Sequence, residues 1–127
     1  MKNTFSERLL PADEATLGNG RVGLGVRLPW YRSLPLSVVE IGEVVIDGQI
    51  VPSERMRLAI NGHTFELGEL SEQVGDFWYV LDSARLEFDW PLDPKTNHEV
   101  TLTLNLYPPY IPGLTWVTRG STTIRAH

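Results

Sequence analysis

Two glycine-containing dipeptides constrain the fold of this chain more than any other feature of its sequence. Asp47-Gly48 lies within VVIDGQIV and Asn61-Gly62 lies within LAINGHTF, and apolar or β-branched residues flank both dipeptides. A two-residue hairpin turn needs a positive φ at both central positions, which asparagine, aspartate and glycine tolerate best. The sequence therefore predicts two β-hairpins, each turning at one of these dipeptides.

Short apolar or alternating runs surround both predicted turns. In the run HEVTLTLNLY, apolar residues alternate with threonine and asparagine, so one face of this strand is predicted to be buried. No window of eleven or more residues sustains a helical period, and Pro11 interrupts the one short candidate. The expected strands span residues 21–28, 38–46, 49–51, 56–60, 64–67, 77–81, 84–88, 99–107 and 115–125.

Many short strands separated by turns predict an all-β fold, an antiparallel β-sandwich or jelly-roll-like barrel. The 127 residues, of which 42% are hydrophobic, are enough for one compact domain with a buried core. We expect residues 1–20 to form an N-terminal arm that is partly irregular, and residues 21–127 to form the single β-sandwich domain.

Composition narrows the function classes. The chain has no cysteine, which fits a reducing compartment, and no segment approaches the roughly 20 apolar residues of a membrane span. Its start lacks the apolar run of a signal peptide, so we expect a cytoplasmic protein. The formal net charge of −5 argues against nucleic acid or an anionic membrane as a partner.

Candidate catalytic and metal-binding residues do not form a recognisable pattern. His63, His98 and His127 are far apart in the sequence, and no His-x-His pair of a β-barrel metal site exists, so we expect solvated histidines in turns and no metal site. There is no Gly-x-Ser-x-Gly elbow and no cysteine nucleophile. The sequence leaves open whether two carboxylates form a sugar-cleaving pair, because the distance between them depends on the fold and not on their spacing in the sequence. We therefore predict no catalytic residue on this chain.

Aromatic residues beside prolines are the strongest functional signal. The segments LPWYRSLPL, DFWYVLD, FDWPLDP and LYPPYIPGLTW contain all four tryptophans and all four tyrosines. About half of these rings are expected in the core, alternate members of FWYVL among them. Proline cannot donate a hydrogen bond to a sheet, so the others are expected in surface loops, where rigid aromatic residues suit a binding surface.

These segments resemble the β (small) subunit of bacterial C-glycoside deglycosidases. The resemblance extends over residues 21–118, and its most distinctive part is Leu-Tyr-Pro-Pro-Tyr-Ile-Pro. It rests on LPWYRSLPLSVVEIGEVVIDGQIVP, INGHTFELGEL, FWYVLDSARL and HEVTLTLNLYPPYIPGLTW.

The resemblance implies that this chain is an accessory subunit without activity of its own. Its partner would be a larger α subunit, similar to sugar-isomerase TIM barrels, that carries the catalytic base and a divalent metal, Mn²⁺. The complex would take a C-glycoside whose sugar is oxidised at C3 and cleave the carbon–carbon bond to a flavonoid-type aglycone by elimination. No cofactor is expected on this chain. We place the partner interface on Trp30, Tyr31, Arg32, Tyr107, Pro108, Pro109, Tyr110, Ile111 and Pro112.

Two other functions stay open at this point. The chain could be a stand-alone carbohydrate-binding module that stacks sugar rings on Trp30, Tyr31 and Trp116. It could also be a β-sandwich whose aromatic loops only close the ends of its own core. The first predicts sugar binding by the isolated chain, and the second predicts a stable monomer without a partner.

Overall fold

Two antiparallel sheets form the body of the protein in the computed structural model, which describes residues 8–18 and 20–125. The first sheet has the order β1 (Ala15–Gly18), β2 (Arg21–Arg27), β9 (Ser83–Asp89), β6 (Arg57–Ile60), β7 (His63–Glu66). The second has the order β11 (Trp116–Ile124), β10 (His98–Leu106), β4 (Val39–Ile46), β5 (Gln49–Ile50). A separate short pair joins β3 (Leu34–Pro35) to β8 (Phe77–Trp78). The 3₁₀ helices are η1 (Ala12–Glu14), η2 (Leu36–Val38), η3 (Ser53–Arg55) and η4 (Leu67–Glu72).

Both predicted hairpins are confirmed. Asp47 and Gly48 have φ values of 50° and 83° and connect β4 to β5, and Asn61 and Gly62, at 54° and 77°, connect β6 to β7. These are the positive values that a two-residue turn requires. The local turn chemistry therefore decided both pairings.

The other predicted strands are present with each end within one residue of its prediction, except for the strand predicted at 77–81, which is much shorter. The structure pairs only Phe77 and Trp78 of the predicted strand 77–81, with Pro35 and Leu34 opposite. Pro35 has no amide hydrogen to donate, and beyond Trp78 the amide of Val80 donates to the Ser33 side chain instead, at 2.9 Å. The ladder therefore ends after two residues.

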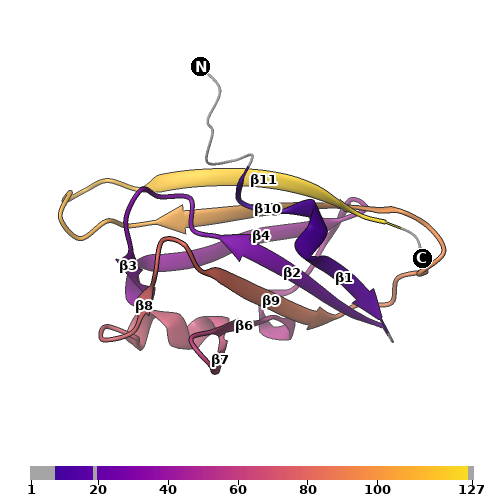
Figure 1. The fold of residues 1–127 in the computed structure, drawn as a ribbon, viewed down its shortest axis with the longest axis horizontal. Helices are drawn as coiled ribbons and strands as arrows, with labels where there is room; N and C mark the ends of the chain where they lie inside the picture. The colour runs from indigo at the N-terminus through magenta and orange to yellow at the C-terminus, as the bar shows by residue number, and fades with distance from the viewer. Residues whose placement is uncertain (1–7, 19, 126–127) are drawn as a thin grey trace, which may run out of the picture.

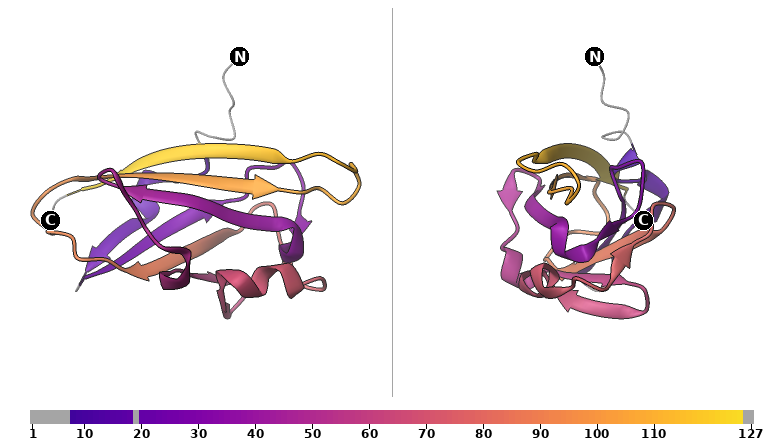
Figure 2. Two further views of the ribbon diagram at one scale, coloured as in Figure 1. Left: turned by 180° about the vertical axis from the view of Figure 1, so that it is seen from behind. Right: turned by 90° about the vertical axis from the view of Figure 1, so that its left-hand side faces the viewer.

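One hydrophobic core lies between the two large sheets (Figure 2). Every second residue of β10 points into it, and Val100, Leu102, Leu104 and Leu106 are completely buried, as their alternation predicts. Residues of β2 and β9 meet them from the other sheet, with Leu24 among them. The predicted all-β, antiparallel class is confirmed.

The sheet begins before residue 21, the predicted start of the β-sandwich domain. β1 pairs with β2 in full register, and Leu9 and Leu10 are buried, with the Leu9 carbonyl accepting from the Arg27 amide at 2.9 Å. A strand of four residues is too short to show an alternation in sequence, which is why it was missed. Residues 1–7 of the predicted arm lie outside the described residues.

The strands run along the long axis of the molecule, so their connections collect at two ends (Figures 1 and 2). At one end lie the connection from β10 to β11, the connection from β2 to β3, and the segment after β8. The opposite end carries the turn at Asp47 and Gly48 and the connection from β9 to β10. None of the helices in the described residues is long and apolar enough to cross a membrane.

Candidate interaction surface

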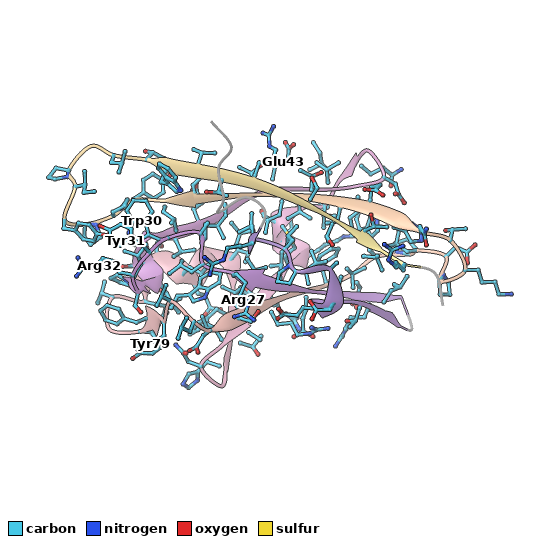
Figure 3. The ribbon with its side chains drawn as sticks, turned by 45° about the horizontal axis from the view of Figure 1, so that its top comes forward. Arg27, Trp30, Tyr31, Arg32, Glu43 and Tyr79 are labelled. Carbon is cyan, nitrogen blue, oxygen red and sulfur yellow. The ribbon has the colours of Figure 1, made fainter. Side chains whose placement is uncertain are left out.

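The structure brings two of the predicted interface segments together at the first of these ends. Residues 30–32 follow β2 and residues 107–112 follow β10. Both segments lie beside the start of β11: Leu106 pairs with Trp116, and the ring centroids of Trp30 and Trp116 are 5.4 Å apart. We call these two segments, together with Trp116, the aromatic end. Figure 3 shows Trp30, Tyr31 and Arg32 side by side at this end.

Three polar atoms connect the two segments of the aromatic end. The indole N–H of Trp30 donates to the hydroxyl of Tyr110, and the Tyr110 hydroxyl lies 3.5 Å from that of Tyr31. The guanidinium carbon of Arg32 lies 4.8 Å from the centre of the Tyr110 ring, which is a cation–π contact. Residues almost 80 positions apart in the chain therefore form one cluster.

Tyr107, the first residue of the second segment, is held by the sheet. Its hydroxyl donates to Glu40 Oε1 at 3.0 Å, an oxygen that also accepts from the Asn105 amide at 2.8 Å, and its backbone amide donates to the Val38 carbonyl. Donation to a carboxylate raises the pKa of the Tyr107 phenol. The hydrogen bond with Tyr110 likewise raises the pKa of Tyr31. Both phenols therefore stay neutral hydrogen-bonding groups.

The connection from β10 to β11 is ordered by its own backbone. The Ile111 amide donates to the Pro108 carbonyl at 3.1 Å, and the Leu114 amide donates to the Ile111 carbonyl at 3.2 Å. Two consecutive turns thus present Tyr110 and Ile111 outward, 42% and 38% exposed. Because proline already restricts the chain, little further ordering is needed when this loop binds a partner.

Two of the nine predicted interface residues are buried in the chain itself. Trp30 is only 7% exposed, and Pro108 is also buried. The Trp30 ring packs against Tyr31 and Trp116, at centroid distances of 5.0 and 5.4 Å, so it supports the surface from beneath. Sequence alone does not show which neighbouring ring turns inward. The exposed members are Tyr31, Arg32, Tyr107, Pro109, Tyr110, Ile111 and Pro112.

The three rings proposed for sugar stacking do not form a flat platform. Trp30 and Trp116 meet edge to face, at 66°, and Trp116 is half-buried. Tyr31, 61% exposed, is therefore the one ring of the three that presents its surface to solvent. Trp30 and Trp116 are therefore used for internal packing, and only Tyr31 of the three is available to stack on a sugar ring.

The expectation that the histidines are solvated is wrong for His98. His98 is buried, not solvated: its Nδ1 lies 2.6 Å from Asp47 Oδ2, and its Nε2 lies 2.7 Å from the Asp93 carbonyl oxygen. These contacts raise the pKa of His98, first through the Asp93 carbonyl, and the imidazole lowers the pKa of Asp47. His63 is exposed on β7, whereas His127 lies outside the described residues. No three His, Asp or Glu side chains gather as a metal-ligand group within residues 8–18 and 20–125.

A second exposed apolar segment lies in DFWYVLD, which the sequence marked as aromatic but which was not among the residues expected at the interface. Phe77, Tyr79 and Leu81 are 36%, 54% and 79% exposed, whereas Trp78 between them is completely buried. Figure 3 places Tyr79 at the same end of the molecule as Tyr31. The alternation of FWYVL was visible in the sequence, but the pattern cannot tell which of its two faces is turned outward.

Comparison with known proteins identifies the family. Residues 13–110 match the C-glycoside deglycosidase beta subunit family. A C-glycoside deglycosidase beta subunit of Microbacterium trichothecenolyticum is 38% identical over 105 residues, covering 83% of this chain and 80% of the relative. One from Arthrobacter globiformis is 36% identical over 108 residues, covering 84% and 82%. The 3'-dehydrocarminate deglycosidase beta subunit of a Microbacterium species is 35% identical over 108 residues, covering 85% and 82%. The chain therefore belongs to the C-glycoside deglycosidase beta subunit family.

Proposed function

We propose that this chain is the accessory subunit of a hetero-oligomeric C-glycoside deglycosidase and that the aromatic end binds its catalytic α subunit. Membership of the beta subunit family supports the role of a subunit. The observation that carries the placement is the set of exposed, preordered apolar side chains at one end of the sandwich, with Tyr110 and Ile111 at its tip. Apolar surface of this kind on one end of a protein marks an interaction site.

The reaction of the complex is an elimination. The substrate is a C-glycoside whose sugar carries a ketone at C3, and this ketone makes the hydrogen on C2 acidic. A general base removes that proton, a C1–C2 double bond forms, and the bond from C1 to the aglycone carbon breaks. The electron pair leaves with the aglycone carbon, which takes up a proton. An aromatic, flavonoid-type aglycone stabilises that leaving group.

We assign the base and the divalent metal, Mn²⁺, to a TIM-barrel-like α subunit. This chain contributes binding: the phenols of Tyr31 and Tyr107 stay neutral because their pKa values are raised, so this end carries no negative phenolate charge. The Tyr107 proton is already donated to Glu40, so its oxygen can only accept from a partner. The 3'-dehydrocarminate deglycosidase beta subunit is named for a substrate that is dehydrogenated at its 3' position, which supports an oxidised sugar as the substrate class.

Reconstitution tests this function. We expect no cleavage of a 3-oxo C-glucoside by this chain alone, and cleavage when it is co-expressed with a C-glycoside deglycosidase α subunit from the same organism. Chromatography measures the released product, and the α subunit alone is assayed in the same way as a control. Full activity of the isolated small chain would overturn the proposal.

A double substitution tests the placement of the interface. Tyr110→Asp with Ile111→Asp puts two carboxylates on exposed positions, so the fold should survive while the complex is lost, because a buried unpaired charge costs several kcal/mol. Co-purification with a tagged α subunit is the measurement. Recovery of the double variant at the wild-type level would exclude the aromatic end as the docking surface.

A further inference from the structure

Residues 74–81 present a row of apolar side chains to solvent. Phe77, Tyr79 and Leu81 point outward at every second position, and Val74 before them is 74% exposed. The rings of Phe77 and Tyr79 are nearly parallel, at 29°, with their centroids 6.4 Å apart. Side chains of this size exposed in a contiguous row are costly for a protein that functions alone.

This segment is held firmly by the residues that it does not expose. Trp78 is completely buried, and its indole N–H donates to the Asp82 carbonyl at 2.9 Å. The Asp82 amide in turn donates to the Tyr79 carbonyl at 2.8 Å. The Val80 amide donates to the Ser33 hydroxyl, and the Arg27 guanidinium donates to the Leu81 carbonyl, both at 2.9 Å. The backbone therefore keeps this outward orientation.

The start of the segment is fastened to two other elements. The Asn61 side chain, in the turn between β6 and β7, donates to Asp76 Oδ1 at 3.1 Å and to the Phe77 carbonyl at 2.7 Å. The Leu36 amide donates to the Asp76 carbonyl at 2.8 Å. An apolar row that is ordered before it binds loses little conformational entropy on association, which is the property of a docking surface.

The exposed apolar side chains of this protein are concentrated at one end. Ten large hydrophobic side chains are exposed among the described residues, and all except Ile50 belong to residue 31, residues 74–81 or residues 107–117. Ser33 connects residues 74–81 to the aromatic end, because it follows Tyr31 and Arg32 directly and binds Val80. The row is thus continuous with the surface that we assign to the α subunit.

We propose that residues 74–81 form the second half of the docking surface for the catalytic α subunit, with Tyr79 and Leu81 as its anchors. This inference rests on the proposed function. Arg32, at the boundary of the two halves, is exposed and has no ion-pair partner among the described residues. The α subunit therefore presents an apolar face to Tyr79 and Leu81, and a carboxylate to Arg32.

The test is a comparison of three variants in the full chain, each bound to a tagged α subunit. Tyr79→Asp with Leu81→Asp changes the second half, and Tyr110→Asp with Ile111→Asp changes the first. Ile50→Asp is the matched control, because Ile50 is 61% exposed but lies on β5, away from this end. We expect the first two variants to weaken binding by at least about tenfold each, and the control to leave it unchanged. Circular dichroism checks that each variant is folded.

The outcomes separate this inference from the proposed function. If the Tyr110 and Ile111 variant loses binding while the Tyr79 and Leu81 variant binds within twofold of wild type, residues 74–81 are not part of the interface and the proposed function stands. If wild-type chain does not bind any α subunit, the proposed function itself fails. If the Tyr79 and Leu81 variant instead abolishes a homodimer seen by light scattering, the occupant is a second copy and the inference is wrong.

Discussion

His98 is the residue whose environment differs most from what its position in the sequence suggests. It opens β10 directly after a polar connection, yet its ring is enclosed, with an oxygen acceptor beside each nitrogen. A carbonyl oxygen can only accept, so Nε2 carries a proton, and the carboxylate of Asp47 favours a second proton on Nδ1. The imidazolium form satisfies both contacts, and it joins the Asp47 turn to the connection before β10.

His98→Phe should therefore destabilise the fold in a pH-dependent way. The pKa of His98 lies above its ordinary value of 6.5, so its contribution is complete below that pH and is lost as the pH rises through the raised pKa. The pKa of Asp47 lies below its ordinary 3.8, so its contribution is complete above that pH and is lost as the pH falls through the lowered pKa. Between the two values the substitution should cost about 2 kcal/mol, and the cost should fall as the pH rises through the raised pKa of His98.

Denaturant unfolding of wild type and variant across this pH range is the measurement for His98. His63→Phe serves as the control, since His63 is exposed and its replacement should cost less than about 0.5 kcal/mol. A His98→Phe penalty that grows as the pH rises above 7 would contradict the imidazolium assignment.

Gly25 is required by a close approach on the outer face of β2. A Cβ at this position would lie 2.4 Å from Glu14 Cβ, and Glu14 accepts from Ser83 at 2.5 Å and pairs with Arg27 at 3.5 Å. Gly25→Ala should displace η1 and cost about 1–3 kcal/mol, measured by thermal unfolding. Gly18→Ala is the control: a Cβ there meets nothing within 4 Å, so stability should be unchanged or slightly raised. Equal effects at both positions would exclude this explanation.

Among the elements, the turn between β6 and β7 has two separate roles. Its backbone forms the hairpin, and the Asn61 side chain also holds the segment that precedes β8. The dipeptide predicted the first role from sequence, because positive φ is a local property of Asn-Gly. The second role depends on Asp76 and Phe77 lying beside the turn, which only the packing of the chain brings about.

Asn61→Gly should separate the two roles. Glycine accepts the positive φ, so the hairpin should persist, while the two side-chain hydrogen bonds are lost at a cost of about 1 kcal/mol each. Amide hydrogen exchange should become faster at Leu36, whose amide donates to the Asp76 carbonyl, and at Val80, whose amide donates to the Ser33 hydroxyl. Exchange at Leu58, which lies on β6 between β7 and β9, should not change. Unchanged exchange at Leu36 and Val80 would show that Asn61 does not brace the segment.

At the level of the whole molecule, the two ends of the sandwich differ in chemistry. One end has exposed aromatic and aliphatic side chains, and the other has the Asp47 and His98 pair and a polar connection. If the first end binds the α subunit, association is driven mainly by apolar burial. The affinity should then change less than about threefold between 0.1 and 1 M salt, and the heat capacity change of binding should be negative.

Calorimetry at two salt concentrations and two temperatures measures both quantities. Arg32→Ala is the informative variant, since it removes the one exposed cation from the boundary of the two halves. Any salt dependence that remains in wild type should disappear in this variant. A loss of affinity of a hundredfold or more at 1 M salt would show that charges, and not the apolar end, drive the association.

Interactions within a few residues of the sequence determine much of this structure. The two turns, the alternation of β10 and the prolines after Tyr107 each act within a few residues, so the strands and the all-β class follow from the sequence. The exposure of Tyr31, Tyr110 and Ile111 also follows from the sequence, because proline beside aromatic residues cannot continue a sheet.

Tertiary packing decided the rest. The order of strands places residues 30–32, 74–81 and 107–112 at one end, and no local pattern contains that information. The inward turn of Trp30 and the burial of His98 both depend on partners distant in sequence, Tyr110 and Asp47. Burial of Trp78 in the core determines which face of the FWYVL segment is exposed to water. A two-residue period is symmetric between its two faces, and only contact with a core breaks that symmetry.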